Sequence, residues 1–202
     1  MMRGSTLAVL FAILFAFASP PTALAEDARP GQQLDLTFTR VLAVARDASL
    51  DAAAKEALVK ELLASRLDYE KSAAMALGIH ARANRARMHE FVPLFRKLLE
   101  KAYVTRIVGA AGEARLVILG ERVDGDLATV DAMIVFKKND IQAAFRLHRT
   151  ERGWMAYDVI VEGISLLSNY RSQFNSLLSK HSFDEVLERL ETKTRVQVKT
   201  SQ

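Results

Sequence analysis

Residues 153–178 read GWMAYDVIVEGISLLSNYRSQFNSLL, and this stretch decides the fold. Its first part, up to Val161, is rich in β-branched and aromatic residues, which favours a strand. Gly163 then marks a bend, because glycine tolerates backbone angles that other residues avoid. The apolar residues that follow recur at helical spacing: Ile164, Leu167, Phe174 and Leu178. The stretch therefore predicts a strand that leads directly into a helix, as in an α+β fold.

Three turn signals upstream of this strand indicate an antiparallel meander. Asp124-Gly125 is a strong two-residue hairpin signal, and Asn139-Asp140 and Glu151-Arg152-Gly153 are two further turns. The sequence therefore predicts a four-stranded sheet, with strands near 115–123, 126–138, 141–150 and 154–161.

The third strand indicates which side chains face the core, because apolar and polar residues alternate along it. A three-residue turn at 151–153 places Asp158 opposite Arg146, whereas a two-residue turn places it beside Phe145, where a carboxylate is costly. We therefore adopt the three-residue turn, which also sets Tyr157 opposite Leu147. The same pairing logic through all four strands gives a continuous inward face: Val117, Leu119, Val130, Ala132, Ile134, Phe136, Phe145, Leu147, Tyr157 and Val159.

The outward face of the predicted sheet is also partly apolar, with Ile118, Met133, Val135, Trp154 and Ile160. An antiparallel sheet usually needs only one apolar face. We therefore expect helices to wrap the sheet.

Helical periodicity and capping residues predict about six helices. Apolar residues recur from Leu34 to Ala45, and Asp51 and Asp68 are plausible N-caps of the next two helices, the second of which stops at Gly78. A long helix with Pro93 inside its apolar pattern follows, with a kink or a late start expected there. Two closing helices complete the chain, the last opened by the Ser182–Glu185 capping box.

These elements predict one domain over residues 26–202. It has a helical first half at 34–107, a sheet at 113–161 and closing helices at 163–193.

The amino terminus has the layout of a secretory signal peptide. Arg3 supplies a short positive region, an apolar run extends from Leu7 to Ala18, and Ala23-Leu24-Ala25 is an A-x-A cleavage site. A membrane anchor is the alternative, but the run is short for a span of ~20 residues. We expect cleavage after Ala25 and an exported, soluble mature chain over residues 26–202.

Composition excludes several classes of function. The net charge of +4 is too small an excess to indicate a nucleic-acid partner, and the absence of cysteine excludes thiol catalysis and cysteine–zinc sites. The four histidines have no metal-site spacing, so we expect no metal and no cofactor. A basic cluster, Arg82, Arg85, Arg87, Arg96, Lys97 and Lys101, is either a solvated helix face or a docking surface for an acidic partner or anionic lipid.

The stretch quoted above resembles the MlaC (toluene-tolerance) family, whose pattern is G-W-x-x-Y-D-V-x-x-E-G-[VI]-S-L-x-x-N-Y-R-x-x-F. The chain matches it at Gly153, Trp154, Tyr157, Asp158, Val159, Glu162, Gly163, Ile164, Ser165, Leu166, Asn169, Tyr170, Arg171 and Phe174. Weaker similarity extends over roughly residues 34–194.

The resemblance implies a monomeric periplasmic carrier of a diacyl phospholipid, with no enzymatic activity. Such a carrier passes lipid between an outer-membrane lipoprotein complex and the substrate-binding subunit of an inner-membrane ABC transporter, which maintains outer-membrane lipid asymmetry. We expect its lipid cavity to lie between the sheet and the helices.

The candidate lipid contacts combine the inward strand residues with one face of the following helix. They are Val117, Leu119, Ile134, Phe136, Phe145, Leu147, Tyr157, Val159, Ile164, Leu167 and Phe174. Asn169, Tyr170 and Arg171 are candidates for the cavity rim, where a guanidinium can hold a lipid phosphate. The inward residues equally suit ordinary core packing, and Arg171 equally suits a pair with Glu162 or a carbonyl cap.

Three other interpretations remain open. The cargo of the same fold can be a hopanoid or another lipid. An NTF2-like enzyme can use Asp158 or Asp131 beside His148. A ligand-free adaptor is the third.

Overall fold

The computed structural model describes residues 29–111, 114–137 and 139–195. The predicted signal peptide, residues 1–25, and its cleavage site lie outside the described residues. Within the described part of the chain, no helix is long and apolar enough to cross a bilayer.

The fold is α+β, and the described residues form seven α-helices rather than about six. They are α1 (Pro30–Arg46), α2 (Ala52–Arg66), α3 (Tyr69–Leu77), α4 (His80–Ala83), α5 (Met88–Ala111), α6 (Leu166–Leu178) and α7 (Phe183–Thr194), with a 3₁₀ turn at Arg85–Arg87. The additional helix is the single turn α4. The predicted caps are confirmed: Asp51, Asp68 and Ser182 each accept a backbone N–H of the helix that they open. Pro93 lies inside α5, which starts at Met88, so a late helix start is wrong.

The sheet is an open antiparallel meander of five strands in the order β1-β2-β3-β4-β5. The strands are β1 (Arg115–Asp124), β2 (Leu127–Val135), β3 (Asp140–Thr150), β4 (Gly153–Val161) and β5 (Ile164–Ser165). The fifth strand was not predicted, because Gly163 was assigned to a bend into a helix. Glu162 and Gly163 instead form a two-residue hairpin loop, in which both have positive φ (49° and 78°).

The β3–β4 register contains both of the alternatives that the sequence offered. Near the turn, Thr150 pairs with Gly153, so the loop has two residues and not the predicted three. A bulge at Tyr157 then adds one residue to β4. Beyond it, Arg146 faces Asp158 and Phe145 faces Val159, as predicted. Tyr157 is therefore the bulged residue, and its predicted pairing with Leu147 is wrong, because Ala156 occupies that position.

A second bulge corrects the predicted facing of β1. Val117 pairs with Met133 and so faces away from the side that Ile134 lines, and the register shifts between Ile118 and Gly120. Leu119 lies in this irregularity and is exposed. The inward positions of β1 belong to residues 116 and 118, because a one-residue shift exchanges the two faces of a strand.

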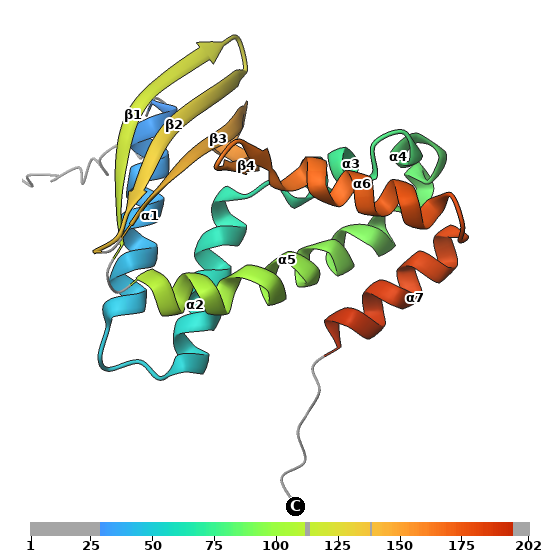
Figure 1. The fold of residues 1–202 in the computed structure, drawn as a ribbon, viewed down its shortest axis with the longest axis horizontal. Helices are drawn as coiled ribbons and strands as arrows, with labels where there is room; N and C mark the ends of the chain where they lie inside the picture. The colour runs from blue at the N-terminus through green and yellow to red at the C-terminus, as the bar shows by residue number, and fades with distance from the viewer. Residues whose placement is uncertain (1–28, 112–113, 138, 196–202) are drawn as a thin grey trace, which may run out of the picture.

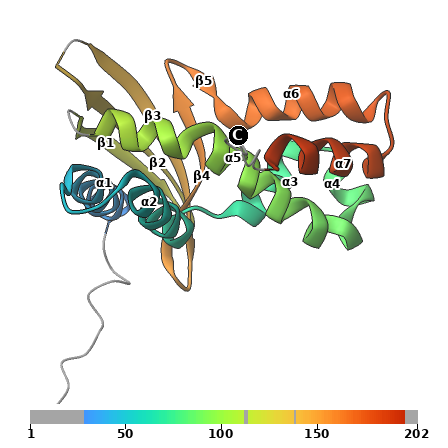
Figure 2. The same cartoon turned by 90° about the horizontal axis from the view of Figure 1, so that it is seen from below.

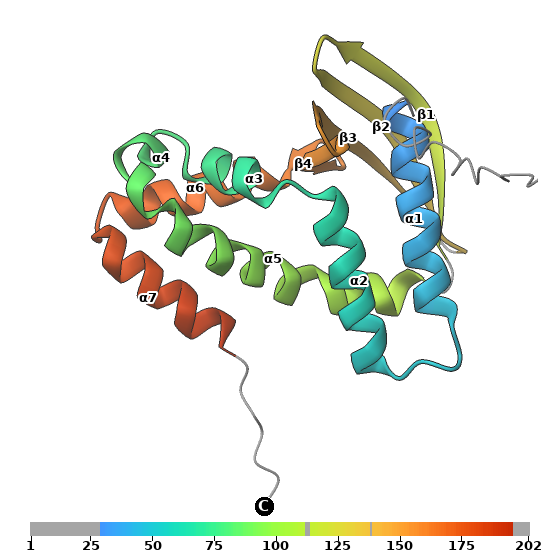
Figure 3. The same ribbon diagram turned by 180° about the vertical axis from the view of Figure 1, so that it is seen from behind.

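The helices form two groups that α5 joins. Helices α1 and α2 lie side by side against the sheet, whereas α3, α4, α6 and α7 gather at the other end of the molecule (Figures 1 and 2). The second group encloses a core that includes Leu77, Phe91, Phe95, Phe174 and Val186. Helix α5 runs from this core to the sheet, where Val104 packs with Val41 and Val59 (Figure 3).

Asp158 fixes the junction between sheet and helical core. Its side chain is 1% exposed, and it accepts hydrogen bonds from the Leu167 N–H at 3.1 Å and the Ser165 hydroxyl at 2.7 Å. Arg146 Nη1 donates to the same carboxylate at 3.3 Å. The carboxylate thus holds β4 against the first turn of α6, where the helix dipole favours a negative charge.

Replacement of Asp158 with alanine should lower the free energy of unfolding by roughly 3 kcal/mol, because the buried N–H of Leu167 and the Arg146 guanidinium both lose their acceptor. Urea unfolding followed by Trp154 fluorescence measures this. The control is Asp131→Ala, which removes the surface pair with Arg122 (2.9 Å) and should cost less than about 1 kcal/mol. Equal losses in the two variants would contradict the role assigned to Asp158.

Candidate functional site

A cavity of about 590 Å³ lies between the sheet and helices α1, α2 and α5. The helices cover the inward face of the sheet there without filling the space against it. Its wall is built from Gln33, Leu34, Thr37, Phe38, Val41, Leu63, Arg66, Leu67, Tyr69, Leu99, Glu100, Tyr103, Val104, Ile107, Ile134, Phe145, Leu147, Trp154, Ala156, Val159, Val161, Ile164, Ser165, Leu166 and Asn169.

The wall is predominantly apolar because each bordering element turns a hydrophobic stripe inward. Leu34, Phe38 and Val41 follow one face of α1, and Leu99, Tyr103 and Ile107 follow one face of α5. The inward residues of β2, β3 and β4 complete the wall. Ile164 and Val161 are the most exposed apolar lining residues, at 68% and 41%, so the cavity reaches the surface beside β5.

The polar side chains of the wall are bound by the protein itself. Gln33 Oε1 accepts the Trp154 N–H at 2.7 Å, and the Thr37 hydroxyl donates to the Gln33 carbonyl at 2.8 Å. Glu100 accepts from Arg96 Nε at 2.6 Å. No buried side-chain nitrogen or oxygen in the described part of the chain lacks a hydrogen-bond partner. The cavity therefore offers its contents few free polar groups.

Of the two lining tyrosines, Tyr69 is a poor candidate for a catalytic base, because its phenol stays protonated at neutral pH. Burial, followed by the nearby Glu100 carboxylate, raises the pKa of Tyr69 to about 12. Tyr103 forms a side-chain hydrogen bond with Tyr170, whose pKa is raised mainly by burial. Among the described residues, no group of three His, Asp or Glu side chains is arranged to hold a metal ion.

The acid–base pairs suggested for an enzyme do not form. His148 Nε2 lies 2.7 Å from Asp68 Oδ2, while Asp131 pairs with Arg122 and Asp158 with Arg146. None of these ionisable groups lines the cavity. The structure thus gives the enzymatic alternative no support in this cavity.

Six of the predicted site residues line the cavity: Ile134, Phe145, Leu147, Val159, Ile164 and Asn169. The structure brings these together from β2, β3, β4, β5 and α6. Their contact with lipid stays a prediction.

The other predicted site residues lie elsewhere. Val117 and Leu119 are displaced by the β1 bulge, and Phe136 packs beside the cluster of Leu42 and Ala45. Tyr157 is turned to His148, with a ring-centroid distance of 5.8 Å. Leu167, Tyr170 and Phe174 belong to the helical core.

Arg171 makes a structural contact, and its predicted place at the cavity rim stays a prediction. Its Nε donates to the Met75 carbonyl at 2.8 Å, and its side chain packs against Gly78, which has a φ of 57°. The guanidinium therefore ties α6 to the end of α3, which agrees with the alternative of a carbonyl cap.

Sequence reasoning missed the cavity residues that α1, α2 and α5 contribute. Their apolar periodicity was visible, but periodicity does not tell which element a helix face covers. Trp154 and Ala156 were also missed. The assumed three-residue turn placed Trp154 on the outward face, whereas the two-residue turn places it inward.

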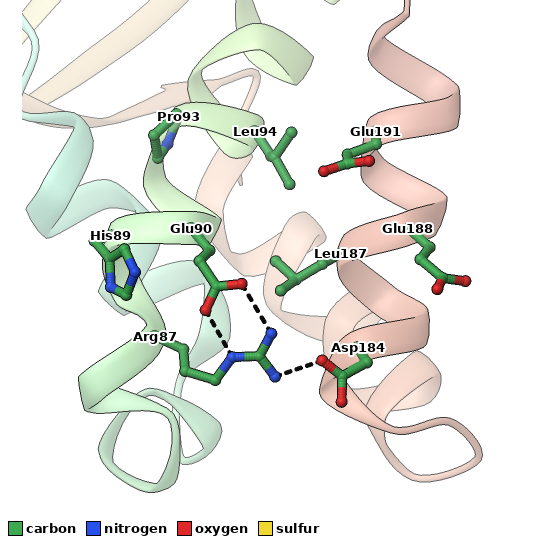
Figure 4. A pocket seen from close by; sticks show the side chains of 9 residues that line it. All are labelled: Arg87, His89, Glu90, Pro93, Leu94, Asp184, Leu187, Glu188 and Glu191. Carbon is green, nitrogen blue, oxygen red and sulfur yellow. Dashed lines mark hydrogen bonds and ion pairs between the residues drawn. The ribbon is translucent and has the colours of Figure 1, made fainter.

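A second hollow, of about 460 Å³, lies between α5 and α7 (Figure 4). Arg87 bridges it, with Nε 2.7 Å from Glu90 and Nη1 2.6 Å from Asp184. Leu94 and Leu187 point into it between the helices, and both are buried. This hollow is the seam between two packed helices, closed by an ion-pair network.

A solved structure has the same fold. It is that of a phospholipid-binding protein from Ralstonia solanacearum in complex with a phospholipid, with a TM-score of 0.72 and 19% sequence identity. The alignment covers 83% of this chain and 97% of that chain. At this identity the likeness shows the fold alone. No curated protein matches the sequence.

The family model described as MlaC protein matches residues 35–192. This match covers most of the chain, including the sheet, the cavity wall and the quoted stretch at 153–178. It agrees with the extent of the resemblance seen in the sequence. The chain belongs to the MlaC family.

Proposed function

We propose that this protein is a periplasmic phospholipid carrier that holds its cargo by the acyl chains. The observation that carries the proposal is the cavity, whose wall is predominantly apolar and whose buried polar side-chain atoms, among the described residues, all have hydrogen-bond partners. Acyl chains need no polar partners, so such a wall suits them. Family membership and a phospholipid-bound protein of the same fold support the proposal.

Because of the hydrophobic effect, a carrier must keep the acyl chains of its phospholipid out of water. The two tails expose on the order of 30 methylene groups, whose return to water costs ~24 kcal/mol at ~0.8 kcal/mol each. The cavity of about 590 Å³ has room for about 20 such groups, if each takes the roughly 30 Å³ of a water molecule in the liquid. Full enclosure of a diacyl lipid therefore requires the cavity to expand.

Family membership supports a proposal for the wider role. The signal peptide over residues 1–25 exports the chain, and residues 26–202 act as a single monomeric domain without a cofactor. The carrier moves phospholipid between an outer-membrane lipoprotein complex and the substrate-binding subunit of an inner-membrane ABC transporter. Its activity is binding and transfer, not catalysis.

Organic extraction of the purified mature protein should release about one phospholipid per chain, because transfer of the tails to water is too costly for the lipid to leave unaided. Mass spectrometry of the extract measures this. If the extract contains hopanoid and no phospholipid, the cargo of the carrier is hopanoid. An extract without lipid, together with no uptake from liposomes, would contradict the carrier function and favour an adaptor.

The substitution Val159→Asp should reduce lipid occupancy at least about tenfold, because it places a carboxylate in the apolar cavity wall. Its matched control is Ile160→Asp on the opposite face of the same strand, which should retain lipid. Occupancy is measured by mass spectrometry, and folding by circular dichroism and thermal unfolding. Normal occupancy in a folded Val159→Asp protein would show that the acyl chains lie elsewhere.

A further inference from the structure

Only two of the described residues in the cavity wall carry a full charge: Glu100 on α5 and Arg66 on α2. Glu100 is neutralised by Arg96, whose Nε lies 2.6 Å away. Arg66 has no such partner, because it forms no ion pair with any described carboxylate. Its Nη1 donates to the Arg152 carbonyl at 2.8 Å. The wall therefore presents one positive charge without a counter-charge.

Two further arginines lie beside Arg66. Arg152, in the β3–β4 turn, donates from Nη2 to the Ser65 carbonyl at 3.1 Å, and Arg40 of α1 is near enough for its charge to act on Arg66. Burial, and then the charges of Arg152 and Arg40, lower the pKa of Arg66. Neither of the two forms an ion pair with a described carboxylate. At its edge of the cavity wall, Arg66 is thus subject to two like charges, and their mutual repulsion is unfavourable.

The end of α2 explains only part of this cluster. Carbonyls at a helix C-terminus favour cations, which accounts for the position of Arg152 and for the last-turn position of Arg66. These carbonyls do not account for Arg40, which lies on another helix. They also do not explain why the Arg66 guanidinium lies in a predominantly apolar wall. An anion at this edge would relieve the repulsion.

We infer that Arg66, flanked by Arg152 and Arg40, binds the phosphate group of the lipid whose tails fill the cavity. A guanidinium has five N–H donors, and Arg66 uses one in the hydrogen bond to Arg152, which leaves donors for a bidentate contact with phosphate oxygens. The inference rests on the proposed function. It places the phosphate contact on Arg66 because Arg66 lines the cavity, whereas Arg171 does not.

The test compares two lipids with the same tails. Lipid-free protein is offered vesicles that contain either radiolabelled dipalmitoyl phosphatidylglycerol or radiolabelled dipalmitoylglycerol, which lacks the phosphate. The wild-type protein should retain the phospholipid better. Arg66→Gln should lower phospholipid retention about tenfold, as expected for a lost charged hydrogen bond, and leave dipalmitoylglycerol retention unchanged.

The matched control is Arg189→Gln, which removes the same charge from an exposed position on α7, outside the cavity wall, and should change neither value. Arg40→Gln is a second test variant, because Arg40 is exposed and makes no hydrogen bond among the described residues, so its loss should spare the fold. Like Arg66→Gln, the Arg40→Gln substitution should lower phospholipid retention. Arg66→Lys should restore part of it.

The outcomes separate the inference from the proposed function. If wild-type and Arg66→Gln proteins retain both lipids equally, the phosphate site is wrong and the carrier stands. If the wild-type protein retains neither lipid, the carrier function itself fails. Calorimetric titration with inorganic phosphate identifies the source of the anion: binding that Arg66→Gln abolishes, with lipid preference unchanged, would assign the cluster to free phosphate and overturn the lipid assignment.

Discussion

Helix α5 is the element on which the rest of the structure depends, because one continuous helix serves both a closed core and an open cavity. In its amino-terminal half, Phe91 and Phe95 are fully buried among α3, α6 and α7. In its carboxy-terminal half, Leu99, Tyr103 and Ile107 face the cavity. Close packing in the first half can hold the helix in place. The second half can then form part of the cavity wall.

The separation between helical core and cavity explains why the residues that identify the family are not those that form most of the cavity wall. Asp158 binds the start of α6, Tyr170 and Phe174 pack in the helical core, and Arg171 binds the end of α3. These contacts need particular side chains at particular distances. Most of the cavity wall needs only apolar side chains of suitable size, so the lining residues of α1, α2 and α5 carry no distinctive motif.

Much of the fold could be predicted from local chemistry. The caps Asp51, Asp68 and Ser182 were recognisable because a short polar side chain at a helix start has one dominant use. The pairing of Asp158 with Arg146 could be predicted because the alternative register buries the Asp158 carboxylate beside Phe145. The facing of Val117 and Trp154 could not be predicted, because it depends on bulges and loop lengths that tertiary packing selects. The apolar stripes of α1 and α5 could be predicted from their helical periodicity. Periodicity does not indicate that these stripes border a cavity.

The acyl chains are predicted to lie in the cavity, between the apolar stripe of α1 and the inward face of β4. A phospholipid with a photoreactive group near the end of one tail, cross-linked to the loaded protein, reports that location through the peptides that it modifies. Adducts on the α1 stripe of Leu34 and Phe38, or on Val159 of β4, are the predicted result. Adducts confined to α6 and α7, with the cavity wall unmodified, would contradict the account.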